Sequence, residues 1–132
     1  QIITADKDRI GQVLTNLITN AIKYSPNANK IIINTSTNHD TIQVSVKDFG
    51  LGIPKKHLPH LFERFYRVHD EDNSKYPGLG IGLFISHQII ERHGGKIWVD
   101  SKHGEGSTFY FKLPIVTKRE KAHASDLFMC IS

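Results

Sequence analysis

The sequence predicts an α+β protein, a two-layer α/β sandwich in which a mixed, mostly antiparallel sheet packs on helices. Two stretches, 12–25 and 82–93, have the apolar spacing of amphipathic helices. Four short stretches rich in β-branched and aromatic residues form two pairs, and a turn joins the members of each pair. The chain has 132 residues, enough for one domain with a real core, so we expect a single folded domain.

The first helix carries a polar stripe beside its apolar face. At about 100° of rotation per residue, Asn16, Asn20 and Lys23 fall on one narrow arc. The apolar arc holds Val13, Leu14, Leu17, Ile18 and Ala21. Asparagine is disfavoured in helices by roughly half a kcal/mol relative to alanine, so two of them one turn apart need a reason. A carbonyl oxygen that binds a hard cation is such a reason.

The later elements follow from local signals. Period-two alternation predicts strands, a proline opens a short helix, and two glycines end the second long helix in the manner of a C-cap. The expected elements are, in order, a hairpin of strands 31–36 and 41–46, a short helix 53–60, the helix 82–93, and strands 96–100 and 108–113.

Composition limits the class of ligand and the cellular location. The net charge of +4 suits a polyanionic ligand such as a nucleotide or a nucleic acid. No apolar run approaches the roughly 20 residues of a membrane span, and the N-terminal segment does not resemble a signal peptide. The single cysteine, Cys130, cannot form an internal disulfide, so we expect a cytoplasmic location, with a parent protein that could be membrane-anchored. We assign 1–116 to the domain and 117–132 to a flexible C-terminal appendage.

Two further features indicate a nucleotide. Gly78, Gly80 and Gly82 precede a helix, where backbone N–H groups can wrap phosphate oxygens, although the same spacing also occurs in plain tight turns. It matches neither the P-loop nor the dinucleotide-binding pattern. Asp48 follows a strand end, where its carboxylate could accept a hydrogen bond from the amine of adenine or could simply cap a turn.

In order and spacing, four segments resemble the N, G1, F and G2 boxes of the sensor histidine kinase catalytic domain. This domain belongs to the GHKL superfamily, which includes gyrase, Hsp90 and MutL. The segments are NLITNAIKYSP (16–26), VKDFGLGIP (46–54), LFERFYRV (61–68) and GLGIGLFIS (78–86). The resemblance covers residues 5–114 and implies the Bergerat ATP-binding fold with an ATP lid, which would lie at 67–76.

The resemblance implies two cofactors, ATP and Mg²⁺. Asn20 would coordinate the Mg²⁺, and Asn16 would support it or contact the phosphates. Lys23 would reach a phosphate, and Arg67, with Arg64 as a second candidate, would reach the γ-phosphate. Each residue also has an ordinary structural explanation, such as a hydrogen bond within the protein, a favourable helix end or a solvated surface position.

At the other end of the nucleotide, Tyr24 would pack against the adenine ring and Asp48 would bind its amine. Tyr24 could instead belong to the core. The other nucleotide-binding positions implied by the resemblance are Gly50, Gly52, Ile53, Gly78, Leu79, Gly80, Ile81, Gly82 and Leu83.

The chemistry expected from the resemblance is phosphoryl transfer. Hydrolysing members of the superfamily carry a glutamate one turn before the magnesium asparagine, and Asn16 occupies that position here. An amide cannot act as a general base for water, so transfer to another nucleophile is favoured. The implied acceptor is a histidine on a separate dimerisation domain, and we find no motif for it in this chain. We therefore expect a protein-histidine kinase fragment that is monomeric alone and acts on a response regulator only through the full-length kinase.

Three other functions remain open. The first is a non-catalytic, nucleotide-gated interaction module, because Leu79 stands where the family usually has a small polar residue and Pro77 where it often has a glycine. The second is a GHKL ATPase clamp, which needs the base that Asn16 does not provide. The third, nucleic-acid binding, is disfavoured because no aromatic and basic stripe lies together on a predicted sheet face. We expect no nucleic acid and no membrane contact by this fragment.

Overall fold

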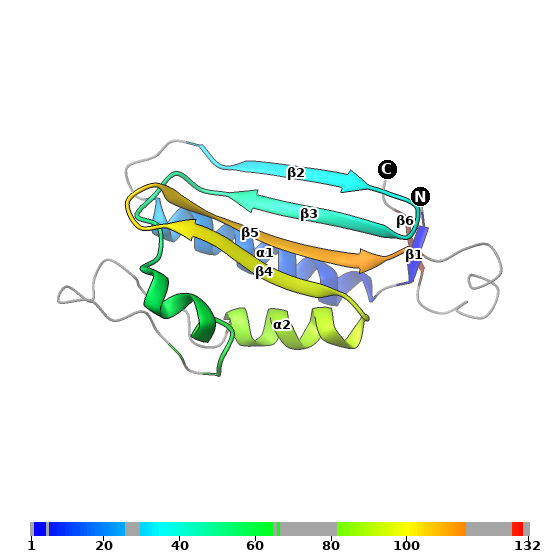
Figure 1. Ribbon diagram of the computed structural model, residues 1–132. Coiled ribbons are helices and arrows are strands. Elements are labelled where there is room, and N and C mark those ends of the chain that lie inside the picture. The colour runs from blue at the N-terminus through cyan, green and yellow to red at the C-terminus, as the bar shows by residue number, and fades with distance from the viewer. Residues whose placement is uncertain are drawn as a thin grey trace.

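Four of the described strands form one antiparallel sheet, and the two described α-helices pack on the same face of it (Figure 1). The computed structural model describes residues 2–4, 6–25, 30–64, 66, 82–115 and 128–130. The strand order is β2-β3-β5-β4, with bounds Ile32–Thr37 (β2), Thr41–Lys47 (β3), Gly106–Pro114 (β5) and Lys96–Lys102 (β4). The predicted two-layer α/β sandwich is confirmed, and the four-stranded sheet is antiparallel throughout.

Helix α1 (Lys7–Tyr24) begins before the predicted residue 12, because Asp6 caps it. The Asp6 side chain accepts hydrogen bonds from the N–H groups of Asp8 and Arg9, both at 3.1 Å. These bonds satisfy donors that the first turn of a helix otherwise leaves unpaired. The predicted apolar arc is buried at Val13, Leu17 and Ala21 and partly buried at Leu14 and Ile18.

The core lies between the helices and the sheet. Along β3 and β5, buried and more exposed residues alternate as the sequence predicts, and the buried apolar side chains are Ile42, Val44, Val46, Phe109, Phe111 and Leu113. Helix α2 (Gly82–Arg92) contributes Leu83, Ile89 and Ile90. It ends at the predicted glycines, where Gly94 has a φ of +74° and Gly95 donates its N–H to Ile90 O. The predicted short helix is a 3₁₀-helix, η1 (Lys55–His60).

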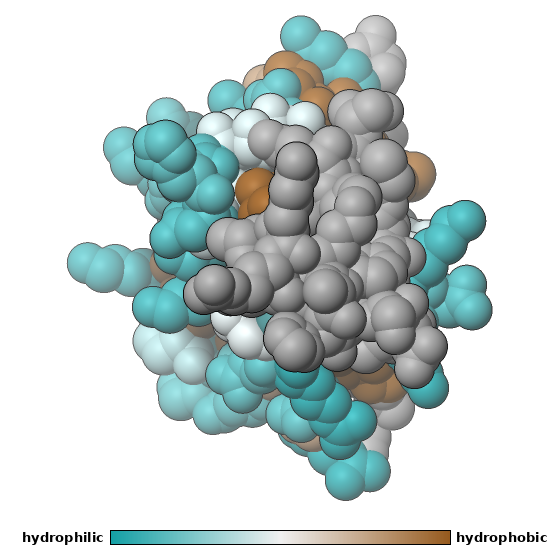
Figure 2. All heavy atoms as spheres, turned by 90° about the vertical axis from the view of Figure 1, so that its right-hand side faces the viewer, coloured by the Kyte–Doolittle hydropathy of each residue, from teal (hydrophilic) through white to brown (hydrophobic). Residues whose placement is uncertain are grey.

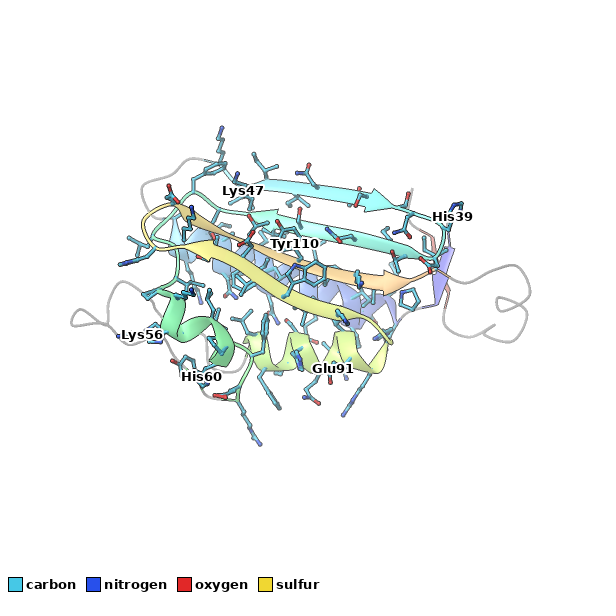
Figure 3. The ribbon with its side chains drawn as sticks, viewed as in Figure 1. His39, Lys47, Lys56, His60, Glu91 and Tyr110 are labelled. Atoms are coloured by element: carbon cyan, nitrogen blue, oxygen red, sulfur yellow. The ribbon has the colours of Figure 1, made fainter. Side chains whose placement is uncertain are left out.

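The outer face of the sheet corrects one expectation. Trp98 lies directly across from Tyr110, and their rings stack with centroids 5.1 Å apart. Lys96 pairs with Lys112 two positions along the same strands. Tyr110, labelled in Figure 3, belongs to β5, which lies between β3 and β4 in the sheet. An aromatic and basic stripe is therefore present on this face, and the expectation of none was wrong. The register between two strands brings these residues together, and the periodicity of one strand does not reveal it.

A separate antiparallel pair joins the two ends of the described chain. Strand β1 (Ile2–Thr4) pairs with β6 (Phe128–Cys130), and neither strand was predicted from the sequence. Figure 2 looks onto this end of the molecule, where the described residues around the margin are largely hydrophilic. In the described part of the chain, neither helix has both the length and the hydropathy that crossing a bilayer requires. The division at residue 116 stays a prediction.

Candidate functional site

One edge of α1 connects two of the predicted nucleotide-binding segments. Asn16 Nδ2 donates hydrogen bonds to Gly82 O at 3.3 Å and to Ser86 Oγ at 3.2 Å. Gly82 is the last glycine of the predicted phosphate cluster and the first residue of α2. Asn16 therefore fixes the N-terminus of α2 beside the polar stripe of α1. The rest of the cluster and one predicted arginine lie outside the described residues, namely Gly78, Leu79, Gly80, Ile81 and Arg67.

The opposite end of the same edge lies near Asp48. The Ser25 hydroxyl, directly after α1, is close enough to the Asp48 carboxylate to oppose the rise in its pKa. Ser25 Oγ and Asp48 Oδ2 are both buried, yet neither completes a hydrogen bond of good geometry among the described residues. The polar edge of α1 thus runs from the start of α2 to the loop that carries Asp48.

Asn20 lies between these two ends, one helical turn after Asn16. Its side chain is buried, with 5% of its surface exposed, and its Nδ2 has no hydrogen-bond partner among the described residues. A buried amide without a partner costs about 1–3 kcal/mol, so such an amide needs an explanation. The two ends of an asparagine amide exchange by a simple flip, so the unpartnered end can present either a donor or a carbonyl oxygen.

Asp48 is the most buried acid of the site. Only 1% of its surface is exposed, and Oδ1 accepts hydrogen bonds from the N–H groups of Gly50 at 3.0 Å and Ser107 at 3.2 Å. Burial raises the pKa of the carboxyl above its usual value, and the hydrogen bonds from Gly50 and Ser107 partly offset this rise. Oδ2 makes no hydrogen bond of good geometry in the described part of the chain, and with the Ser25 hydroxyl near the carboxylate it still has room to accept a further donor.

The loop after Asp48 lies so close to the β4–β5 hairpin that only glycine fits at one position. Gly52 has a φ of +69°, and a Cβ there would lie 1.9 Å from Lys102 O. Gly104 also has a positive φ, +89°, but a Cβ there would meet nothing within 4 Å. These two glycines separate the cost of the backbone conformation from the cost of the close approach.

We therefore expect Gly52→Ala to destabilise the fold by at least about 2 kcal/mol more than Gly104→Ala, which should cost only about 1–2 kcal/mol for its positive φ. Urea unfolding of both variants measures the difference. Equal losses would contradict the predicted tight packing of the loop on the hairpin.

The remaining predicted residues occupy varied positions. Lys23 is exposed in the last turn of α1, and the Arg64 guanidinium lies 6.0 Å from the centroid of the Phe84 ring on α2. Ile53 and Leu83 are buried in the core. The Tyr24 side chain lies outside the described part of the structure.

Sequence reasoning missed the serines that surround Asp48. Ser107 holds the carboxylate through its N–H, and Ser25 lies near it. Ser86, in the first turns of α2, accepts a hydrogen bond from the Asn16 amide. Single serines in a turn, a strand or a helix carry no distinctive sequence signal, and their roles depend on long-range packing.

The chain matches a protein family described as histidine kinase-, DNA gyrase B-, and HSP90-like ATPase over residues 5–117. It is 42% identical over 120 residues to the sensor histidine kinase WalK of Bacillus subtilis, a match that covers 89% of this chain and 20% of WalK. The chain therefore spans about a fifth of the length of this relative.

Two solved structures share the fold. The catalytic domain of histidine kinase ThkA superposes with a TM-score of 0.72 and 35% identity, covering 85% of this chain and 71% of that one. Full-length ShkA in complex with AMPPNP superposes with a TM-score of 0.73 and 30% identity, covering 87% of this chain and 23% of ShkA. With the matched family, these likenesses show that the chain belongs to the histidine kinase-, DNA gyrase B- and HSP90-like ATPases, as a catalytic domain of the sensor histidine kinase type.

Proposed function

We propose that this chain binds Mg-ATP along the polar edge of α1 and transfers the γ-phosphate to a histidine on a dimerisation domain outside the chain. The observation that carries the proposal is the course of this edge, from Asn16 at the start of α2 to Ser25 beside the buried Asp48. A ligand with an anionic end and a hydrogen-bonding base fits the two ends. The nucleotide analogue in ShkA and the name of WalK support the same function.

The base end of this site is suited to adenine. Asp48 Oδ2 is a buried acceptor without a partner among the described residues, and adenine offers an N–H donor at its 6-amine. Because Oδ1 is already held by two backbone N–H groups, the direction of Oδ2 is set before a ligand arrives. Such preorganisation lowers the cost of binding.

The residues also fit a magnesium ion. Asn20 has a buried amide end that makes no hydrogen bond in the described part of the chain, and an amide oxygen is a ligand that Mg²⁺ accepts alongside waters and phosphate oxygens. When bound, the ion would neutralise charge on the phosphates. Lys23 and Arg67 would bind phosphate oxygens, with Arg64 as a second candidate.

Water is poorly activated at this site, because Asn16 stands where hydrolysing members of the superfamily carry a glutamate base. Its amide nitrogen donates to Gly82 O and Ser86 Oγ, and an amide has no useful basicity near neutral pH. Asn16 therefore serves to position the phosphate-binding end of α2. Transfer to an acceptor histidine needs placement and charge neutralisation more than a strong base for water.

The test is a transfer assay with γ-labelled ATP, this chain and the dimerisation domain of its parent kinase. We expect a label on the acceptor that acid removes, as is usual for phosphohistidine, and none on an acceptor whose histidine is replaced by glutamine. ATP turnover without acceptor would favour the clamp function. Tight nucleotide binding with no labelled acceptor would favour the interaction module.

We also propose that the isolated chain is a monomer, and that it reaches a response regulator only through the full-length kinase. Dimerisation in this kind of kinase would belong to the separate helical domain. Sedimentation of the isolated chain tests this part, and a stable dimer in dilute solution would contradict it.

A further inference from the structure

The loop that carries Asp48 is fastened to the β4–β5 hairpin at both of its ends. At the first end, Asp48 and Ser107 exchange two hydrogen bonds, from Asp48 N to Ser107 O at 2.8 Å and from Ser107 N to Asp48 Oδ1 at 3.2 Å. At the second end, Ile53 N donates to Ser101 Oγ at 2.8 Å. Lys47, labelled in Figure 3, marks the end of β3 where this loop begins.

Ser101 links the hydrogen bonds at the two ends of the loop. Its Oγ lies 2.7 Å from Ser107 Oγ and 3.1 Å from Gly106 O, while it also accepts the Ile53 N–H. One hydroxyl carries one proton, so the Ser101 hydroxyl can donate to Gly106 O while it accepts from Ser107. A single side chain therefore joins the far end of the loop to the residue whose N–H holds Asp48.

Backbone packing leaves this arrangement little freedom. A Cβ on Gly106 would lie 2.3 Å from Asp48 O, so the hairpin touches the loop directly at this point. Gly104 N donates to Leu51 O, which adds a third point of attachment between the hairpin and the loop. Two side chains make the hydrogen bonds between this loop and the hairpin: Asp48 at the first end of the loop and Ser101 at the second.

We propose that Ser101 is a positioning residue for base selection, which sets Ser107 and through it the direction of the Asp48 carboxylate. This inference rests on the proposed function. Without its hydroxyl, Ile53 N–H and Ser107 Oγ each lose a partner, and the loop is free to shift at its far end. A shift that tilts Asp48 Oδ2 weakens its hydrogen bond to an adenine amine and leaves contacts to phosphate unchanged.

The binding experiment compares ATP with ITP, whose base carries a carbonyl oxygen where adenine has its amine. We expect Ser101→Ala to lower ATP affinity about tenfold in calorimetry and to leave ITP affinity nearly unchanged, so that the preference for adenine falls by about the same factor. Ser101→Thr keeps the hydroxyl and should keep the preference. Ser45→Ala, on the outer face of β3, is the matched control and should behave as wild type.

A loss of affinity that is equal for both nucleotides, or absent for both, would overturn the proposal. Circular dichroism of Ser101→Ala shows whether it folds, and Ser101→Thr tests the hydroxyl separately if it does not. Wild-type protein that binds neither nucleotide would instead overturn the proposed function.

Amide hydrogen exchange on the nucleotide-free chain tests the same link without any ligand. Ser101→Ala should speed exchange at Ile53, and also at Gly50 and Ser107, which donate to Asp48 Oδ1. Faster exchange at Ile53 alone would show that Ser101 does not act through Asp48, and would end the proposal whatever the nucleotide data show.

Discussion

Asp48→Asn is expected to lower the affinity for ATP about 100-fold. The substitution keeps the shape of the side chain, and an asparagine oxygen can still accept the N–H groups of Gly50 and Ser107. It then places an NH₂ donor where Oδ2 now stands, facing the donor of the adenine amine. Two buried donors face to face leave both unsatisfied. Calorimetry with ATP measures the loss.

The same substitution should make the protein no less stable at neutral pH. Burial raises the pKa of Asp48 above its ordinary value of 3.8, so the folded state binds this proton more readily than the unfolded chain does. The contribution of this group to stability therefore falls as the pH rises from 3.8 through the folded pKa. Asparagine carries no such cost.

The advantage of Asp48→Asn should consequently be largest above the folded pKa and should vanish once the pH falls below 3.8. Urea unfolding of both proteins across this pH range measures it. Asp100→Asn is the matched control, because Asp100 is exposed on β4 and should alter neither stability nor ATP binding appreciably. ATP binding that survives in Asp48→Asn would mean that another group binds the base.

The sequence predicted most of the fold because its signals are local. Alternation in β3 and β5 and the helical spacing in α1 and α2 each depend on neighbours a few residues apart. The order of the four boxes then identified the family, since four motifs are very improbable in this order by chance. The short strands β1 and β6 were missed because three residues are too few for a pattern to be visible.

The boundaries were less predictable because they depend on particular hydrogen bonds. The cap at Asp6 extends α1 toward the N-terminus, and among the added residues Ile10 is buried with the apolar stripe, three residues before Val13. Strand β5 begins at Gly106, before the predicted residue 108, because a glycine with a φ of +92° continues the pairing up to the tight turn. Such turns decide strand ends, and apolar alternation does not record them.

The site divides in the same way. Asp48 and Asn20 could be named from their segments, but the bond from Asn16 to Gly82 joins residues 66 positions apart, so only the folded chain places it. The role of Ser107 depends on how β3 and β5 align, and this alignment is also a long-range property. Residue type alone could not separate a serine that holds an acid from one that faces solvent.

Asn20→Ala is expected to remove most of the magnesium dependence of nucleotide binding and to lower phosphoryl transfer 100-fold or more, while costing little stability. The Asn20 Nδ2 has no hydrogen-bond partner in the described part of the chain, so its removal breaks no bond recorded there. Alanine also favours the helix by roughly half a kcal/mol over asparagine. Titration with ATP, with and without Mg²⁺, measures the first effect, and thermal unfolding measures the second.

Asn16→Ala supplies the contrast, because the two asparagines share one stripe but not one environment. Loss of the Asn16 amide breaks its bonds to Gly82 O and Ser86 Oγ between α1 and α2, so we expect a loss of about 1–2 kcal/mol in stability. If Asn20→Ala is destabilised as much, the Asn20 amide has a structural role and the assignment of Asn20 to the metal loses its support. If its binding of ATP keeps the wild-type response to Mg²⁺, the ion is held by other groups, because no buried amide end remains at that position to receive it.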